Sequence, residues 1–210
     1  MKRRRVKITG IGPVTPAGIG REAFTRGIRE PVSRVVLSKK CNAAACVLVL
    51  EPSESPRPAY AFIEGYGPQQ SDAGNPYSGL SVALRLALAN TGRRSGEIDR
   101  VQAAGTGHKL ADAAEAEALH EVFGEGLEFV AAVSIKGAIG NALGAARAID
   151  VGCAALGMHH SVVPPTVNWQ YADPDCSLNL SREPRALASH SALVNTHGPC
   201  GAHSCLVLQR

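Results

Sequence analysis

The stretch Ser134-Ile-Lys-Gly-Ala-Ile-Gly-Asn-Ala-Leu-Gly-Ala-Ala-Arg-Ala148 decides how the rest of the sequence is interpreted. A β-favouring run from Phe129 to Ile135 precedes Lys136, and the small residues that follow predict a buried helix from Ala142 to His159. Lys136 and Asn141 therefore fall at a strand-to-helix turn, where free N–H groups and the helix dipole favour a negatively polarised oxygen. The alternative is that the small residues only let a helix pack closely on a sheet.

The composition is that of a globular α/β protein. Of the 210 residues, 45% are hydrophobic but only 4% are aromatic, so the core must consist of Ala, Val, Leu and Ile. The net charge of +4 is small, and no basic stripe with interleaved aromatic residues is present, which argues against nucleic acid as a partner. No apolar run reaches membrane-spanning length, and no secretory segment follows the basic start. We expect a cytoplasmic protein without a membrane partner.

The six cysteines contain no Cys-x-x-Cys spacing and fall mostly in apolar patterns. This usage favours buried thiols over a disulfide framework. The cysteines are Cys41, Cys46, Cys153, Cys176, Cys200 and Cys205.

Hydrophobic periodicity predicts alternating strands and helices along most of the chain. The continuous apolar run Ala45 to Leu50 is typical of a strand buried on both faces, and the turn-rich residues after it predict a hairpin with Tyr60 to Tyr66. Asp112 and Glu115 have the spacing of a helix N-cap and its partner. The predicted strands or extended segments are 5–11, 45–50, 60–66, 99–104, 129–135, 162–166, 192–196 and 204–209, and the predicted helices are 21–29, 78–90, 112–123 and 142–159.

Six segments resemble, in the same order, the β-ketoacyl-acyl carrier protein synthases, the condensing enzymes of the thiolase fold. They are the opening strand (6–18), the mid-chain apolar strand (45–51), the loop of the first catalytic histidine (103–112), the lysine and second-histidine segment (134–148), the Val-Pro-Pro-Thr piece (162–168) and the closing glycine loop (195–210). The resemblance implies a thiolase-like α/β fold with a mixed sheet packed against helices. Residues 1–210 then form one truncated domain, with 1–30 as a remnant of the N-terminal half and 43–210 as the C-terminal half.

The departures from the family concern its catalytic residues. In that family a cysteine thiolate takes up the acyl chain, and two imidazoles stabilise the enolate formed when malonyl loses carbon dioxide. The segment that bears the cysteine is absent, because the sequence passes between Glu30 and Ala43 from the first helix to the mid-chain strand. The first histidine falls on Ala104 and the second on Asn141. Asn141 still has a donor, whereas losing one oxyanion donor, as at Ala104, costs about a hundred- to a thousandfold in rate.

Other positions match the family and are relics of its site. Lys136 matches the family lysine, and Glu115 stands where the family has the carboxylate associated with that lysine. The resemblance therefore implies a Glu115–Lys136 pair, with helix capping by Glu115 as the alternative. Thr106 matches a position that hydrogen-bonds the phosphopantetheine arm of the carrier, and His108 replaces a threonine beside it. The alternative is that Thr106 only satisfies backbone groups of its loop.

A group of histidines and one cysteine lies in the closing loop. His197 and Pro199 stand where the family has phenylalanines that gate the acyl pocket. The residue types at His197, Cys200 and His203 suit a metal ion, but a glycine loop does not fix their geometry, so the sequence predicts no metal site. Cys200 is an alternative nucleophile.

Together these features predict a non-condensing ketosynthase-like subunit that acts beside a full-length ketosynthase and an acyl carrier protein in polyketide or fatty-acid-type biosynthesis, as chain-length factors do. The alternatives are an acyltransferase with a repurposed nucleophile and a non-catalytic structural remnant. No cofactor is expected other than the phosphopantetheine arm as a ligand. We also expect a homo- or hetero-oligomer, because a missing half would uncover the apolar faces of Ala45 to Leu50 and of Ala142 to Leu156.

Overall fold

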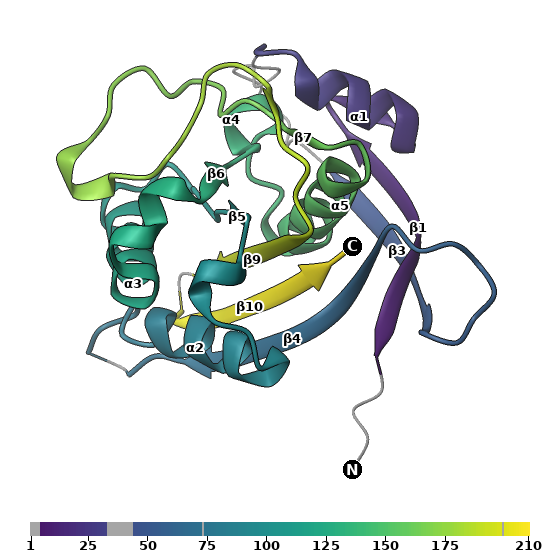
Figure 1. The fold of residues 1–210 in the computed structure, drawn as a ribbon. Coiled ribbons are helices and arrows are strands. Elements are labelled where there is room, and N and C mark those ends of the chain that lie inside the picture. Colours follow the sequence, from purple (N-terminus) through teal and green to yellow (C-terminus); the bar gives the residue numbers. More distant parts are fainter. Residues whose placement is uncertain (1–4, 33–43, 73, 199) are drawn as a thin grey trace.

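A mixed β-sheet with helices on both faces forms the framework of the computed structural model, which describes residues 5–32, 44–72, 74–198 and 200–210 (Figure 1). The strands are β1 (Val6–Thr15), β2 (Gly18–Ile19), β3 (Ala45–Pro52), β4 (Ala61–Gln70), β5 (Arg100–Gln102), β6 (Ala131–Val133), β7 (Val162–Val163), β8 (Arg185–Ala186), β9 (Ser191–His197) and β10 (Ala202–Gln209). The α-helices are α1 (Arg21–Arg29), α2 (Leu80–Thr91), α3 (Lys109–Phe123), α4 (Lys136–Ile139) and α5 (Ala146–His159). Short 3-10 helices occupy Ser95–Glu97, Gly124–Phe129, Leu143–Ala145 and Pro174–Cys176.

The main sheet combines antiparallel and parallel pairing. Its strand order is β2-β1-β4-β10-β9-β5-β6, with β3 paired to β1, while β7 and β8 form a separate ladder. The strands β1, β4, β10 and β9 pair antiparallel, whereas β9, β5 and β6 pair parallel. The parallel pairs bring the ends of β5 and β6 to one edge of the sheet, and the segments that carry Ala104 and Lys136 begin there.

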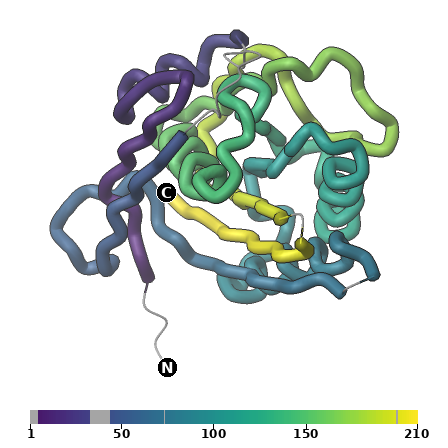
Figure 2. The backbone as a smooth tube through the Cα atoms, turned by 180° about the vertical axis from the view of Figure 1, so that it is seen from behind, coloured from purple at the N-terminus to yellow at the C-terminus, as the bar shows by residue number. Residues whose placement is uncertain are grey.

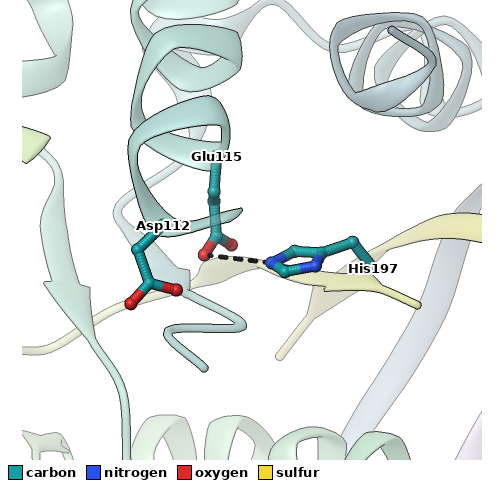
Figure 3. Close-up of side chains that lie close together, drawn as sticks. All are labelled: Asp112, Glu115 and His197. Atoms are coloured by element: carbon teal, nitrogen blue, oxygen red, sulfur yellow. Dashed lines mark ion pairs between the residues drawn. The ribbon is translucent and has the colours of Figure 1, made fainter. Parts of the chain in front are cut away.

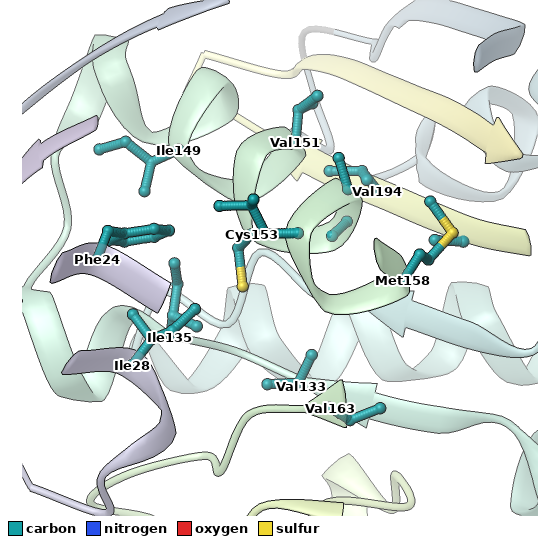
Figure 4. Close-up of a cluster of buried hydrophobic side chains, with 14 of the residues drawn as sticks. Phe24, Ile28, Val133, Ile135, Ile149, Val151, Cys153, Met158, Val163 and Val194 are labelled. Carbon is teal, nitrogen blue, oxygen red and sulfur yellow. The ribbon is translucent and has the colours of Figure 1, made fainter. Parts of the chain in front are cut away.

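Two hydrophobic clusters lie on opposite faces of this sheet. In β9, Val194 joins the cluster built with α1 and α5, and Leu193 joins the cluster built with α2 and α3. Successive strand residues point to opposite faces, so the alternation along β9 places the two pairs of helices on the two sides. Figure 4 shows part of the first cluster, to which Phe24 and Ile28 of α1 and Ile149 and Cys153 of α5 belong. The mixed α/β fold class is confirmed.

Helix α5 is covered by the chain itself. All its residues from Ile149 to Met158 are buried, since α1, the sheet and β7 pack around it. The expectation that this helix would present an uncovered apolar face is therefore wrong. Its predicted start at Ala142 is also wrong, because Gly140, with φ at 80°, ends the short helix α4 and a 3-10 turn over Leu143–Ala145 precedes α5.

Strand β3 is an edge strand, which corrects two predictions. It pairs with β1 along its whole length, and β1 also pairs with β4, so β3 and β4 form no hairpin. Val47 is 67% exposed and Leu50 is 52% exposed, so the strand is not buried on both faces. Figures 1 and 2 show β1 and β3 at the side of the molecule opposite α3. Apolar composition indicated burial of this strand, but no element of the described residues covers its exposed side chains.

Candidate functional site

The loop between β5 and α3 is held by the carboxylate of Glu115. Its Oε1 accepts hydrogen bonds from the Ala104 N–H at 2.7 Å and from Asn195 Nδ2 at 2.7 Å, and its Oε2 accepts from the Gly105 N–H at 2.9 Å. Glu115 is buried on α3, so these three donors replace the water that the carboxylate loses. Glu115 thus fixes the backbone that carries Ala104 rather than serving as a helix cap.

Asp112 holds the next part of the same loop. Its Oδ1 accepts from the Thr106 N–H at 2.7 Å and from the Thr106 hydroxyl at 3.1 Å, and its Oδ2 accepts from the Gly107 N–H at 2.8 Å. The predicted N-cap role of Asp112 is wrong, because α3 begins at Lys109 and the Nδ1 of His108 accepts from the Ala111 N–H. The structure therefore gives His108 a capping role, and the Thr106 hydroxyl is engaged within its own loop.

Lys136 pairs with a residue that the sequence did not suggest. Its Nζ lies 2.8 Å from Oδ2 of Asp150 in α5, and the two side chains are 9% and 2% exposed. The predicted Glu115–Lys136 pair is wrong, since the Glu115 oxygens are taken up by the loop and Asn195. Burial raises the pKa of Asp150 to about 6, although the Lys136 ammonium opposes this shift.

Close backbone packing fixes the position of Lys136. A Cβ on Gly137 would lie 1.9 Å from the carbonyl oxygen of Val167, so only glycine permits this approach. The N–H of Ser134 also donates to the Thr166 hydroxyl at 3.2 Å. Consequently the extended segment after β7 lies directly against the turn that carries Lys136.

Asn141 lies in the loop between α4 and the following 3-10 turn, and it is exposed. Its Oδ1 accepts from the Leu143 N–H at 3.1 Å, which orients the side chain as a local turn. Leu143 has a positive φ of 50°, which this turn supports. The amide group of Asn141 remains available to a ligand as a donor.

Two cavities meet at these residues. Cavity A has a volume of about 620 Å³, cavity B has a volume of about 490 Å³, and both are lined by Thr106, Lys136 and Asn141. Further residues of cavity A are Tyr77, Ala104, His108, Leu143, Arg147, Asp150, Thr196 and His197, and further residues of cavity B are Asp112, Glu115, Trp169, Tyr171, Cys176 and Leu178. Lys136, Asn141, Ala104, Thr106 and His108 thus line cavity A, and Glu115 lines the adjoining cavity B, while their catalytic and binding roles stay predictions.

His197 adds an imidazole to cavity A. Its Nε2 lies 4.0 Å from Oε2 of Glu115 (Figure 3). Its ring packs edge-on against Tyr77. The side chain is 3% exposed, and Nε2 has no hydrogen-bond partner among the described residues. His197 Nε2 and Asn195 Oδ1 are thus buried polar atoms around Glu115 that have no hydrogen-bond partner among the described residues.

The sequence cluster of His197, Cys200 and His203 does not come together as a ligand set. His197 faces Glu115, His203 Nε2 lies 2.6 Å from the Ser71 hydroxyl, and Cys200 is exposed. Pro199, the other replaced gating position, lies outside the described residues.

A different trio, Asp112, Glu115 and His197, has its potential ligand atoms within 4.8 Å of one another. Backbone N–H groups already donate to both carboxylates, as described above for the loop. A metal ion would have to displace these donors, so the trio is better explained as a hydrogen-bond network.

No thiol in the described part of cavities A and B is activated. Cys176 lines cavity B, where burial raises its pKa to about 11 with further raising by Asp112 and Glu115. Burial likewise raises the pKa of Cys46 to about 11 and of Cys153 to about 12. Cys200 lines neither cavity, and Cys41 lies outside the described residues.

Within the described ranges, no helix has both the length and the apolar character needed to span a membrane.

Comparison with known proteins identifies the family. Residues 60–170 match the model described as "Beta-ketoacyl synthase, C-terminal domain". The chain is 29% identical over 223 residues to 3-oxoacyl-acyl-carrier-protein synthase 2 of Coxiella burnetii (strain RSA 493 / Nine Mile phase I), covering 93% of this chain and 52% of the relative.

Two solved structures are similar to the fold. "The ishigamide ketosynthase/chain length factor" has a TM-score of 0.69 and 31% identity over 79% of this chain and 42% of that chain. "AntDE:AntF (apo): type II PKS acyl-carrier protein in complex with its ketosynthase bound to the hexaketide" has a TM-score of 0.75 and 27% identity over 79% of this chain and 43% of that chain. The chain spans about half the length of these proteins. It belongs to the β-ketoacyl synthase family, and its fold is thiolase-like.

Proposed function

We propose that this chain is a non-condensing ketosynthase-like subunit that acts beside a full-length ketosynthase and an acyl carrier protein. The observation that carries the proposal is the wall of cavity A, where Ala104 lies beside Lys136 and Asn141. The resemblance puts a catalytic imidazole at Ala104, and a methyl group donates no hydrogen bond to an oxyanion. Among the described residues, cavity A has the family's lysine but no cysteine, and such a cavity suits binding of an acyl chain better than its condensation.

The similar proteins support the partners in this proposal. One similar structure is named as a ketosynthase/chain length factor, and another is named as a complex of a ketosynthase with an acyl-carrier protein. This chain covers less than half of each. A partner ketosynthase would supply the nucleophile that cavity A lacks, and the pathway would be of the polyketide or fatty-acid type.

The carrier arm would enter near Thr106 and His108. Both residues line cavity A, and Thr106 also lines cavity B. Because the Thr106 hydroxyl already donates to Asp112, it would act toward the arm as an acceptor or through rearrangement of the loop. No other cofactor is part of the proposal.

Co-purification tests the proposal. The tagged chain is co-expressed with the full-length ketosynthase and the acyl carrier protein encoded nearest to it, and the complex is analysed by light scattering. We expect a complex with the ketosynthase whose polyketide or fatty-acyl product changes in length when this chain is omitted. An unchanged product spectrum together with no complex would refute the proposal. If the chain is instead an acyltransferase with a repurposed nucleophile, the isolated chain should catalyse acyl transfer.

A further inference from the structure

Arg147 reaches into cavity A and is anchored at one end of its guanidinium group. It is the second residue of α5, and its Nη1 donates to the hydroxyl of Ser204 in β10 at 2.7 Å. The Ser204 and Thr196 hydroxyl oxygens lie 3.0 Å apart, and both residues are buried. The hydrogen bond to Ser204 restricts the rotation of the Arg147 side chain, at a cost in conformational entropy. Because the guanidinium group is planar, this one contact also defines where its remaining N–H donors lie.

Arg147 is an exposed residue, and it forms no ion pair with a carboxylate of the described residues. Lys136 and Asp150 form an ion pair in the same cavity. None of the ion pairs found among residues 5–32, 44–72, 74–198 and 200–210 includes Arg147. Of the fixed charges that line cavity A, the guanidinium is thus the one that lacks a counter-ion.

The surroundings of Arg147 are suited to a small anion. Arginine presents five N–H donors in a planar fork, and Ser204 takes one of them. Leu143, Ala104 and Ala111 line the same cavity and lower its polarity. The Nε2 of His197 faces the Glu115 carboxylate at 4.0 Å, so the anion contact in cavity A falls to Arg147. A carboxylate or a phosphate matches the guanidinium fork in shape and charge.

We propose that cavity A binds an anionic group through Arg147, namely a carboxylate or a phosphate carried by the ligand that enters the cavity. Ser204 and Thr196 position the guanidinium, and the apolar wall strengthens its attraction for the anion. The ligand itself, a carrier-bound acyl chain or its pantetheine arm, rests on the proposed function. The preference for an anion depends on Arg147 alone. It would make cavity A bind an acidic ligand more tightly than a neutral ligand of similar length.

Three small probes distinguish the source of the anion. They are the amide analogues of acetyl-pantetheine, which is neutral, and of malonyl-pantetheine, which carries a carboxylate, together with phosphopantetheine, which carries a phosphate. Calorimetric titration of the full chain measures the dissociation constant of each. We expect at least one anionic probe to bind about tenfold more tightly than the neutral probe, and the tighter one identifies the group that Arg147 recognises.

Variants assign this preference to Arg147. We expect Arg147→Gln to remove the preference for the anionic probe and to leave binding of the neutral probe unchanged, whereas Arg147→Lys retains part of it. Ser204→Ala should weaken the preference less than Arg147→Gln does. Arg26→Gln, an exposed arginine on α1 outside cavity A, is the matched control and should change nothing. Thermal unfolding of each variant verifies that it is folded.

The result also separates this inference from the proposed function. Equal affinities for the three probes, absence of binding by all of them, or a preference that survives Arg147→Gln would overturn the inference. A chain that prefers the anionic probe but forms no complex with ketosynthase or carrier protein would contradict the proposed function alone. A chain that forms the complex without any anion preference would contradict the inference alone.

Discussion

The ammonium of Lys136 lies 2.8 Å from the carboxylate of Asp150, and this buried pair joins the turn after β6 to the first turns of α5. Gln102 of β5 completes the contact, since its Nε2 lies 3.5 Å from Oδ1 of Asp150. The pair therefore connects the turn after β6 and helix α5, which both line cavity A, with strand β5 behind them. Removing either partner leaves an unpaired charge on a side chain that is no more than 9% exposed.

The first prediction concerns Lys136→Met, which keeps most of the length of the side chain but removes its charge. We expect the free energy of unfolding to fall by about 3–5 kcal/mol at pH 8, because Asp150 is left buried and unpaired. The loss should be smaller at pH 5, where Asp150 takes up a proton. Urea unfolding at both pH values measures this, with the exposed Lys109→Met as control. Equal losses at pH 5 and pH 8 would contradict the pairing.

The second prediction concerns the pH dependence that Asp150 itself introduces. The pKa of Asp150 is about 6 in the folded protein, whereas its ordinary value is 3.8. Between pH 3.8 and about pH 6 the folded protein therefore binds a proton at Asp150 that the unfolded chain does not bind. Stability from this group is therefore fully present below about pH 4 and is lost as the pH rises to about 6. The free energy of unfolding of Asp150→Asn should lack this decline. Other carboxylates are common to both proteins, so the difference between the two curves isolates Asp150.

These residues also show what the sequence could predict. Lys136 and Asn141 were predicted to lie together at a strand-to-helix turn, and the family resemblance added Ala104 to them. The parallel pairing of β5 and β6, which brings the two segments to one edge of the sheet, is seen only in the structure. The partner of Lys136 was missed, because Asp150 lies in the middle of an apolar helix pattern and its contact is between elements. A lone acidic residue in a buried helix was the signal that a counter-charge must exist.

The topology at the other edge of the sheet escaped prediction for a similar reason. The apolar run of β3 suggested a buried strand and a hairpin with β4, but β1 pairs with both of them. The position of β1 between β3 and β4 depends on contacts between residues far apart in the sequence, and hydrophobic periodicity does not predict such contacts. By contrast α1, α2 and the pair β9 and β10 follow the predicted ranges closely, because their patterns are local.

The third prediction concerns Glu115, which accepts hydrogen bonds from two backbone N–H groups and from Asn195. Glu115→Ala would leave these buried donors without an acceptor, at about 1–3 kcal/mol for each unsatisfied group. We expect a loss of several kcal/mol in the free energy of unfolding by chemical denaturation. Glu117→Ala, an exposed glutamate two residues further along α3, should cost less than about 0.5 kcal/mol. Similar losses for the two variants would show that the loop does not depend on Glu115.

The fourth prediction concerns catalysis by the isolated chain. It should neither release carbon dioxide from malonyl-carrier protein nor form a stable acyl adduct. The Ala104 side chain lacks a donor, and the Cys176 thiol of cavity B has a raised pKa. Mass spectrometry of the intact chain after incubation with acyl- and malonyl-carrier protein tests both points. An adduct that disappears in Cys200→Ser would establish the repurposed acyltransferase in place of the non-condensing subunit.

The last prediction concerns the exposed edge strand β3 and the partner that covers it. Val47 and Leu50 are 67% and 52% exposed, and β3 pairs on one side only among the described strands. An apolar edge strand of this kind is an aggregation risk in a monomer, so we expect a second protein to cover it. A second copy would repeat the same half of the fold, whereas a full-length ketosynthase would supply the other half, and we therefore expect the latter.

Light scattering of the chain alone and with the co-expressed ketosynthase measures this association. Val47→Lys should abolish the complex with little change in thermal stability, because the side chain already faces solvent. Val82→Lys, at a 40% exposed position on α2, is the matched control and should leave the complex intact. If the chain is monomeric in dilute solution and remains so with the ketosynthase present, β3 is not an interface. If both variants lose the complex equally, the effect comes from added charge rather than from the edge strand.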